Sequence, residues 1–171
     1  SRERPPNRML FAAIPVLCAL VLGLATLSSV QVGSIQDDAW YLVTADALAA
    51  GRGFVRLWTP DLMAETSLPP GLPVLLSPLR WLFPGSFLPA QLFLLACTLG
   101  VVWLAGSYYR RHMDDTTAWL ATLFLVVNVG VIQHSTVVMT EAAYTFCVLI
   151  IMAICRRQDE RGGISVSVLV A

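Results

Sequence analysis

Long runs of apolar residues dominate the pattern of this chain. Residues 9–30 carry no charged side chain, and residues 87–109 have Gln91 as their one strongly polar interruption. A third apolar stretch, 118–155, is about twice the roughly 20 residues that a helix needs to cross a bilayer, and a short polar cluster at 133–136 divides it. The pattern therefore predicts transmembrane spans at about 9–30, 87–109, 118–133 and 137–155, with a fifth beginning at 164.

Composition supports a membrane protein and excludes one class of partner. The 171 residues are 57% hydrophobic and 13% charged, whereas a soluble domain is about half apolar and about a quarter charged. The net charge of zero offers no electrostatic basis for binding nucleic acid. We expect an all-α, polytopic transmembrane helical bundle in which 1–171 is the N-terminal part of one transmembrane domain.

Arginine placement predicts the orientation, because cytoplasmic loops collect positive charge. The arginines that flank the predicted spans fall on one side of the membrane if the chain crosses twice between each cluster: Arg2, Arg4, Arg8, Arg110, Arg111, Arg156, Arg157 and Arg161. This places the protein in the cell membrane with its N-terminus in the cytoplasm. Residues 31–86 then form a large external loop, and the turn at 133–136 faces the same side.

The external loop contains two segments that we expect at the membrane surface. Residues 37–50 predict a helix that Gly51 and Gly53 end. Residues 72–83 are apolar but short and contain two prolines and an arginine, so we interpret them as an interfacial or re-entrant piece.

Three carboxylates are candidate catalytic groups. Asp37 and Asp38 closely follow the first predicted span, and one interpretation is a general base acting on an acceptor hydroxyl. The other is helix capping from Ser34, with both acids favoured by the helix dipole. Glu141 lies among apolar residues near the start of the predicted fourth span, where a carboxylate is costly and marks a function or a buried partner.

Four further residues are candidates for binding substrate or phosphate. Arg52 and Arg56 have the bidentate geometry that phosphate favours, although interfacial arginines also contact lipid headgroups. Tyr41 belongs to the predicted surface helix. His134 lies at the turn at 133–136, and the two interpretations are that it binds phosphate or a metal, or that it is simply solvated.

The order of these features resembles the GT-C glycosyltransferases, especially the family 39-like group of protein O-mannosyltransferases and aminoarabinose transferases. The matching stretches are Asp37-Asp-Ala-Trp-Tyr, Leu68-Pro-Pro-Gly-Leu-Pro73 and Met139-Thr-Glu-Ala-Ala-Tyr144. Together they extend over most of 9–155.

The resemblance implies a membrane glycosyltransferase that moves a sugar, with inversion, from a polyprenyl-phosphate donor to an acceptor hydroxyl on the external face. Asp37 would then be the catalytic acidic residue, acting as the general base, with Asp38 as its acidic neighbour and Glu141 as a second site carboxylate. Arg52, Arg56 or a divalent metal would stabilise the leaving phosphate. The implied partners are the lipid-linked donor, membrane lipids and a glycan, lipid or protein acceptor.

Two other classes remain open from the residues themselves. Acidic groups in the membrane and proline-broken helices also mark transporters and flippases. A non-catalytic membrane assembly subunit would tolerate replacement of Asp37, Asp38 and Glu141 together.

Overall fold

The computed structural model describes residues 8–28, 33 and 36–160, and this part of the chain is all-α. Two of its residues, Val55 and Ala64, form an isolated antiparallel bridge, and no strand is present in the described ranges. Some predictions lie outside the described residues: the positions of Arg2, Arg4 and Arg161, the Ser34 cap and the fifth span at 164. The helices are α1 (Arg8–Ala25), α2 (Gln36–Ala49), α3 (Gly71–Leu82), α4 (Leu88–His112), α5 (Asp115–Val127), α6 (Val129–His134) and α7 (Thr140–Glu160).

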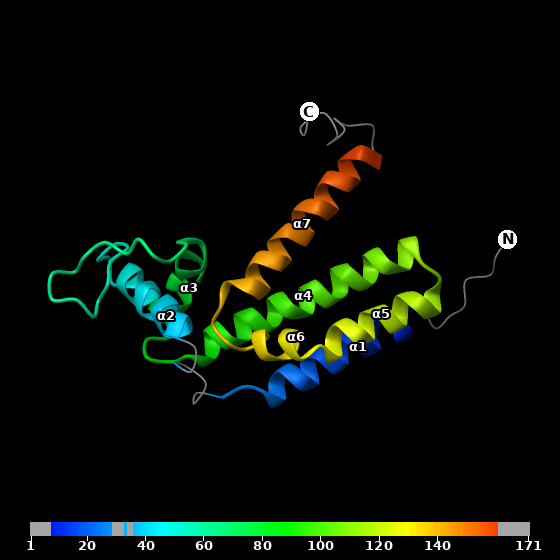
Figure 1. The fold of residues 1–171 in the computed structure, drawn as a ribbon, viewed down its shortest axis with the longest axis horizontal. Helices are drawn as coiled ribbons and strands as arrows, with labels where there is room; N and C mark the ends of the chain where they lie inside the picture. Colours follow the sequence, from blue (N-terminus) through cyan, green and yellow to red (C-terminus); the bar gives the residue numbers. More distant parts are fainter. Residues whose placement is uncertain (1–7, 29–32, 34–35, 161–171) are drawn as a thin grey trace.

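The long helix α4 is the centre of a helical bundle, with α1, α5 and α7 packed around it (Figure 1). Buried Ala19, Val102 and Val126 join α1, α4 and α5 in one apolar cluster. Gly100 of α4 allows the close approach of α7, since a Cβ at this position would clash with the Phe146 ring. Small residues at such contacts are typical of helices that pack inside membranes.

Helices α2 and α3 form a separate lobe at one end of the bundle (Figure 1). The predicted helix over 37–50 is confirmed as α2, and it ends in the predicted place. Gly51 takes a positive φ of 70°, its N–H donates to the Leu48 carbonyl, and the Arg52 N–H donates to the Ala47 carbonyl. This paired pattern is a Schellman motif, in which glycine accepts the left-handed conformation without a steric cost.

An ion pair fixes α3 against α2. The Arg80 guanidinium donates to both carboxylate oxygens of Asp46, at 2.6 and 2.8 Å, and to the Ser86 carbonyl at 2.6 Å. It also lies over the Phe87 ring, 5.4 Å from the centroid. Arg80 is therefore turned into the lobe, and the opposite face of α3 leaves Val74, Leu75 and Trp81 exposed.

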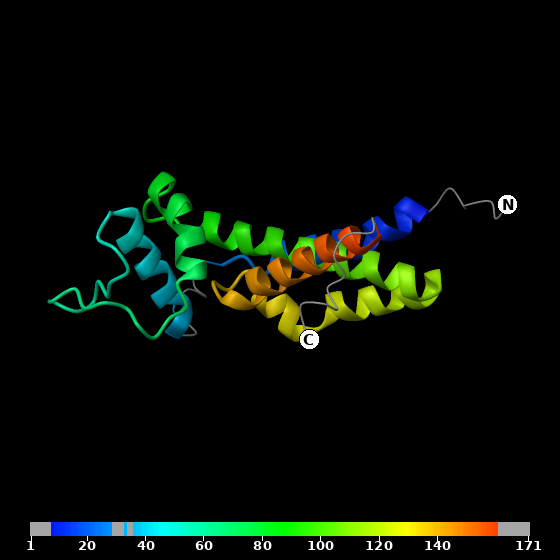
Figure 2. The same ribbon diagram turned by 90° about the horizontal axis from the view of Figure 1, so that it is seen from above.

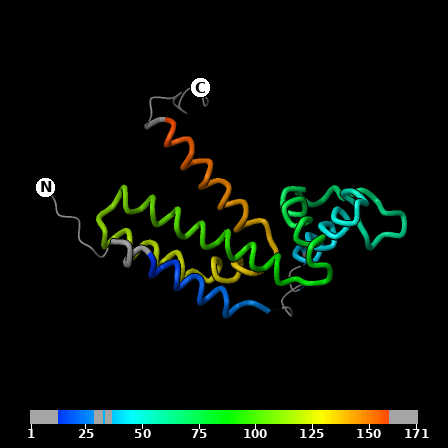
Figure 3. The backbone as a smooth tube through the Cα atoms, turned by 180° about the vertical axis from the view of Figure 1, so that it is seen from behind, coloured from blue at the N-terminus to red at the C-terminus, as the bar shows by residue number. Residues whose placement is uncertain are grey.

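Polar contacts tie together the end of α1, the start of α4 and the turn before α7. The Gln91 side chain donates to the Ser28 carbonyl at 3.0 Å, and the hydroxyls of Thr26 and Thr136 are 3.2 Å apart. We call this end of the bundle, next to α2 and α3, the lobe end. The start of α1, the end of α4 and the start of α5 meet at the opposite end (Figures 2 and 3).

One helix in the described part, α4, is long and apolar enough to cross a membrane, with a mean hydropathy of 1.9. Residues Ala13–Ala25 and Asp115–Val127 form shorter apolar helices. A single helix of this kind does not establish a multi-pass protein, because the core helix of a soluble protein has the same length and composition. The all-α class is thus confirmed, while the set of membrane crossings stays a prediction.

The predicted span over 118–133 differs from the structure in one respect. Its helix is broken at Asn128, which ends α5 and begins α6. Asn128 has a ψ of 123°, outside the helical region, and its side-chain oxygen accepts a hydrogen bond from the Gly130 N–H at 2.9 Å. Asparagine competes with the helix for backbone hydrogen bonds in this way, so a new helix starts in a new direction.

Candidate functional site

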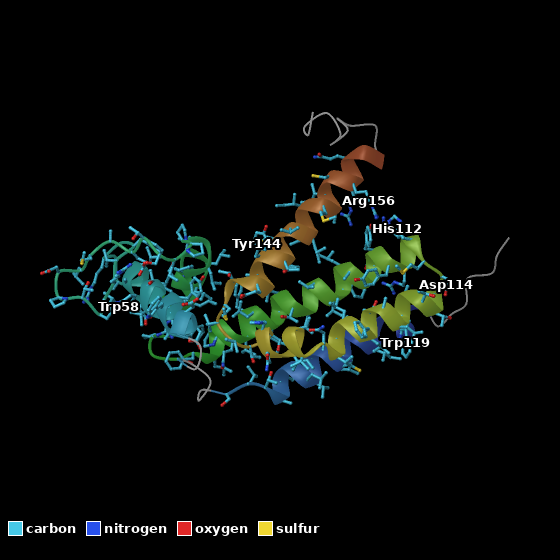
Figure 4. The ribbon with its side chains drawn as sticks, viewed as in Figure 1. Trp58, His112, Asp114, Trp119, Tyr144 and Arg156 are labelled. Carbon is cyan, nitrogen blue, oxygen red and sulfur yellow. The ribbon has the colours of Figure 1, made fainter. Side chains whose placement is uncertain are left out.

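The lobe meets the bundle through a shared apolar core. Tyr41, Leu42 and Ala45 of α2 are buried with Leu94 of α4 and Ala142 of α7, and this cluster also includes Leu68, Leu72, Leu76, Ala90, Cys97, Val138 and Ala143. Consequently the first turns of α2 and α7 lie near each other, although about a hundred residues separate them in the chain. Figure 4 shows Trp58 in the lobe, with His112 and Asp114 at the opposite end of the molecule.

The two neighbouring acids of α2 have different surroundings. Asp38 is only 1% exposed, and its carboxylate accepts hydrogen bonds from the backbone N–H groups of Gly33 at 2.9 Å and Ala39 at 2.7 Å. Asp37 is exposed. Asp38 therefore stabilises the start of α2, where a negative charge is favoured by the helix dipole, and Asp37 is the acid that faces solvent.

Tyr41 connects the acids of α2 and α7. Burial raises the pKa of its phenol above the ordinary value of 10.0, while a hydrogen bond with the Thr140 side chain lowers it. The negative charges of Asp37 and then Glu141 raise the same pKa further. The phenol is consequently neutral at physiological pH, so its hydroxyl can donate a hydrogen bond. Asp37 and Glu141 therefore each lie close enough to Tyr41 for their charges to affect its phenol.

His134 lines the same cavity as Glu141. It ends α6, and its Nδ1 atom is buried without a hydrogen-bond partner in the described structure. His134 and Glu141 both line a cavity of about 260 Å³ between α4, α5, α6 and α7. Asp37 is not among the residues that line it. Glu141 therefore stands between the cavity and the cluster of Asp37 and Tyr41.

The two arginines proposed for phosphate binding have different surroundings. Arg52 is exposed just after the C-terminal end of α2, roughly 20 Å from Asp37 at 1.5 Å of rise per residue. Arg56 donates to Glu65 at 3.1 and 3.2 Å and to the Ser67 hydroxyl at 2.7 Å. Its guanidinium therefore joins two parts of the loop after α2, and the rings of Trp40 and Trp58 stack with their centroids 5.7 Å apart.

The Arg56–Glu65 pair predicts an acid-sensitive loop. Burial alone raises the pKa of Glu65, but hydrogen bonds from Ser67 and the ion pair with Arg56 outweigh burial and hold the pKa below its ordinary value of 4.5. When the pKa of a carboxyl is lower in the folded protein than in the unfolded chain, its charged form stabilises the fold. This stabilisation is fully present at pH values above the pKa of the unfolded chain, and it is lost as the pH falls through the pKa of the folded protein.

We therefore expect the free energy of unfolding of Glu65→Gln to be about 1–2 kcal/mol lower than that of the wild type at neutral pH, because the variant loses hydrogen bonds to a charged carboxylate. The difference should shrink once pH falls below 4.5. Chemical unfolding of both proteins across this range measures it. The exposed Asp61→Asn serves as the control, and a difference that grew on acidification would contradict the assignment.

The structure also reveals residues that sequence patterns did not single out. Thr140 contacts Tyr41, Asn128 redirects α6, and Asp46 pairs with Arg80. Of these three features, only the helix break at Asn128 has a local sequence signal, because asparagine is a common helix-capping residue. The Thr140–Tyr41 and Asp46–Arg80 contacts join residues that are distant in the chain. In the described ranges no three His, Cys, Asp or Glu side chains gather to hold a metal ion, so we assign no step to the divalent metal considered above.

Fold and site together define an all-α protein whose acidic cluster lies where a helical lobe meets the end of a bundle. No protein-family model, curated protein or solved structure matches the chain.

Proposed function

We propose that the protein is a membrane glycosyltransferase that moves a sugar from a polyprenyl-phosphate donor to an acceptor hydroxyl, with inversion, on the external side of the cell membrane. The observation that carries the proposal is that Asp37 and Glu141 both lie close enough to Tyr41 at the lobe end for their charges to raise its pKa. A positioned carboxylate is a common general base for abstracting a hydroxyl proton.

The surface of the bundle supports a membrane location. Large apolar side chains are exposed on every long helix, including Leu17, Val21, Leu92, Trp103, Leu120, Phe124, Ile151 and Met152. Apolar surface this extensive is rare on soluble monomers and fits contact with lipid. The ends of α4 and α7 that carry Arg110, Arg111, Arg156 and Arg157 lie away from the lobe. This agrees with a lobe on the external side.

The proposed reaction uses Asp37 as the base. Its carboxylate takes the proton from the acceptor hydroxyl as the hydroxyl oxygen attacks the anomeric carbon. The bond from that carbon to the phosphate oxygen breaks, and the lipid phosphate leaves with the bonding electron pair. Tyr41 and Glu141 orient the acceptor, Tyr41 by donating a hydrogen bond and Glu141 by accepting one.

The test is a transfer assay with the full-length protein in lipid vesicles. A radiolabelled polyprenyl-phosphate sugar is supplied on the lobe side, and labelled product is analysed for the configuration of the new bond. We expect transfer with inversion and release of polyprenyl phosphate. Uptake of the sugar lipid across the membrane without transfer would instead identify a transporter or flippase.

A further inference from the structure

Helix α3 has one apolar face that nothing in the described part of the chain covers. Four side chains recur along this face at the spacing of helical turns and are 48–69% exposed: Val74, Leu75, Trp81 and Leu82. The next residue, Phe83, is 51% exposed. We call these five residues the α3 face. The opposite side of the helix is buried and packs against α2.

The other segment that the sequence predicts at the membrane surface, α2, uses its apolar residues differently. Tyr41, Leu42 and Ala45 are buried in the core that the lobe shares with the bundle, and Trp40 stacks on Trp58. The structure therefore leaves α3, and not α2, with an apolar face for the membrane surface.

The charged and hydroxyl groups of α3 are satisfied inside the protein. Arg80 is the only charged residue in 71–88, and it is buried against Asp46. Pro78 lacks the N–H that would bond the Val74 carbonyl in a regular helix. The Ser77 hydroxyl donates to this carbonyl instead, at 3.0 Å. None of these groups needs a hydrogen bond from water, which is the condition for a helix surface in contact with lipid.

Lipid fits the α3 face better than a second protein does. A helix of 12 residues is about 18 Å long and about 10 Å wide, which is small beside the roughly 800 Å² that each partner contributes to a stable protein interface. Such interfaces also form about one hydrogen bond per 100–200 Å², and the only side-chain donor on the α3 face is the indole N–H of Trp81. Tryptophan is enriched at headgroup level, because its ring is apolar and its N–H is polar.

The chain connection keeps α3 close to the start of a helix that can cross a bilayer. Residues 83–87 join α3 to α4, so the two helix ends are at most about 20 Å apart at roughly 3.5 Å per residue. Helix α4 has the length and hydropathy of a span, and its first turns expose Leu88 and Leu92. Helix α3 runs across the direction of α4 (Figures 1 and 2), as a helix does when it lies on a membrane that α4 crosses.

We propose that the lobe binds the external lipid surface through α3, with the α3 face in the outer edge of the hydrocarbon and the Trp81 N–H among the headgroups. Because Arg80 pairs with Asp46, lipid contact by α3 also positions α2, which carries Asp37, relative to the membrane. The inference rests on the membrane location in the proposed function and not on sugar transfer.

Photolabelling from within the lipid tests the proposal. The full chain, at one copy per lipid nanodisc, is irradiated with a phospholipid that carries a diazirine in its acyl chain, and labelled residues are mapped by mass spectrometry. The α4 segment around Trp103, which is 52% exposed, is the positive reference. The loop at 55–64 is the negative reference. It exposes Trp58 and Met63, but it also exposes charged Asp61 and extends away from the bundle (Figure 1).

Residues 74–83 should be labelled about tenfold more than 55–64, since both segments expose apolar side chains but only α3 lies in lipid. Labelling of α4 without labelling of 74–83 would overturn the proposal and leave the membrane location intact. Absence of label from both would overturn the proposal and the membrane location together. Labelling of 74–83 in a protein that transfers no sugar would support the proposal and count only against the transferase.

Two equally exposed residues give a matched pair of variants. Leu82 on the α3 face is 57% exposed and Met63 in the loop is 58% exposed, so glutamate at either position should leave the fold intact, which circular dichroism checks. Leu82→Glu should reduce the labelling of 74–83 about tenfold, because a carboxylate is costly in hydrocarbon. Met63→Glu should leave that labelling unchanged. Unaltered labelling of 74–83 in Leu82→Glu would overturn the proposal.

Discussion

Asp37→Asn is expected to reduce sugar transfer by the full-length protein by about 10²–10⁴-fold, the contribution typical of a positioned general base. The amide cannot accept the proton of the acceptor hydroxyl, although it has nearly the same size and keeps hydrogen-bonding capacity. Because Asp37 is exposed, its replacement should leave the unfolding temperature of the protein nearly unchanged. Initial rates with radiolabelled donor, together with thermal unfolding in detergent, measure both quantities.

Asp38→Asn is the matched control, since it makes the same chemical change at the next position. Asp38 is buried and accepts from two backbone N–H groups, so its replacement should lower stability by about 1–2 kcal/mol. Transfer by the folded fraction should fall far less than in Asp37→Asn. Full transfer by Asp37→Asn would refute the role of Asp37, and loss of transfer only in Asp38→Asn would move that role to Asp38.

Asp46→Ala is expected to lower the free energy of unfolding by about 2–3 kcal/mol. Loss of one partner from a buried ion pair costs about 3–5 kcal/mol when both groups are enclosed. Here the Arg80 side chain is 5% exposed and that of Asp46 is 37% exposed, so water screens part of the interaction. The remaining Arg80 charge keeps the Ser86 carbonyl and the Phe87 ring as neighbours but has no counter-ion in its buried position.

Chemical unfolding monitored by far-UV circular dichroism measures this loss, and hydrogen exchange should rise first in α2 and α3. Arg52→Ala is the control, because Arg52 is exposed beyond the end of α2 and its replacement should change stability by less than about 0.5 kcal/mol. Equal stabilities for Asp46→Ala and Arg52→Ala would mean that the Arg80–Asp46 pair does not hold the lobe together.

Local sequence determined the helices of this protein. The apolar run at 87–109 overlaps α4, and the run at 118–155 overlaps α5, α6 and α7. The C-terminal end of α2 at Gly51 followed from the glycine alone. These features are readable because helix formation and helix ending depend on residues only a few positions apart.

Only the tertiary structure decided which side chains are buried and which distant side chains lie close to each other. Asp37 and Asp38 are chemically identical neighbours, and only the rotation of α2 against the core buries one and exposes the other. Tyr41 meets Glu141 because the lobe packs on the first turn of α7. Arg80 meets Asp46 across 34 positions. Such contacts depend on how helices dock, and docking is governed by side-chain packing over the whole surface of each helix, which no short stretch of sequence encodes.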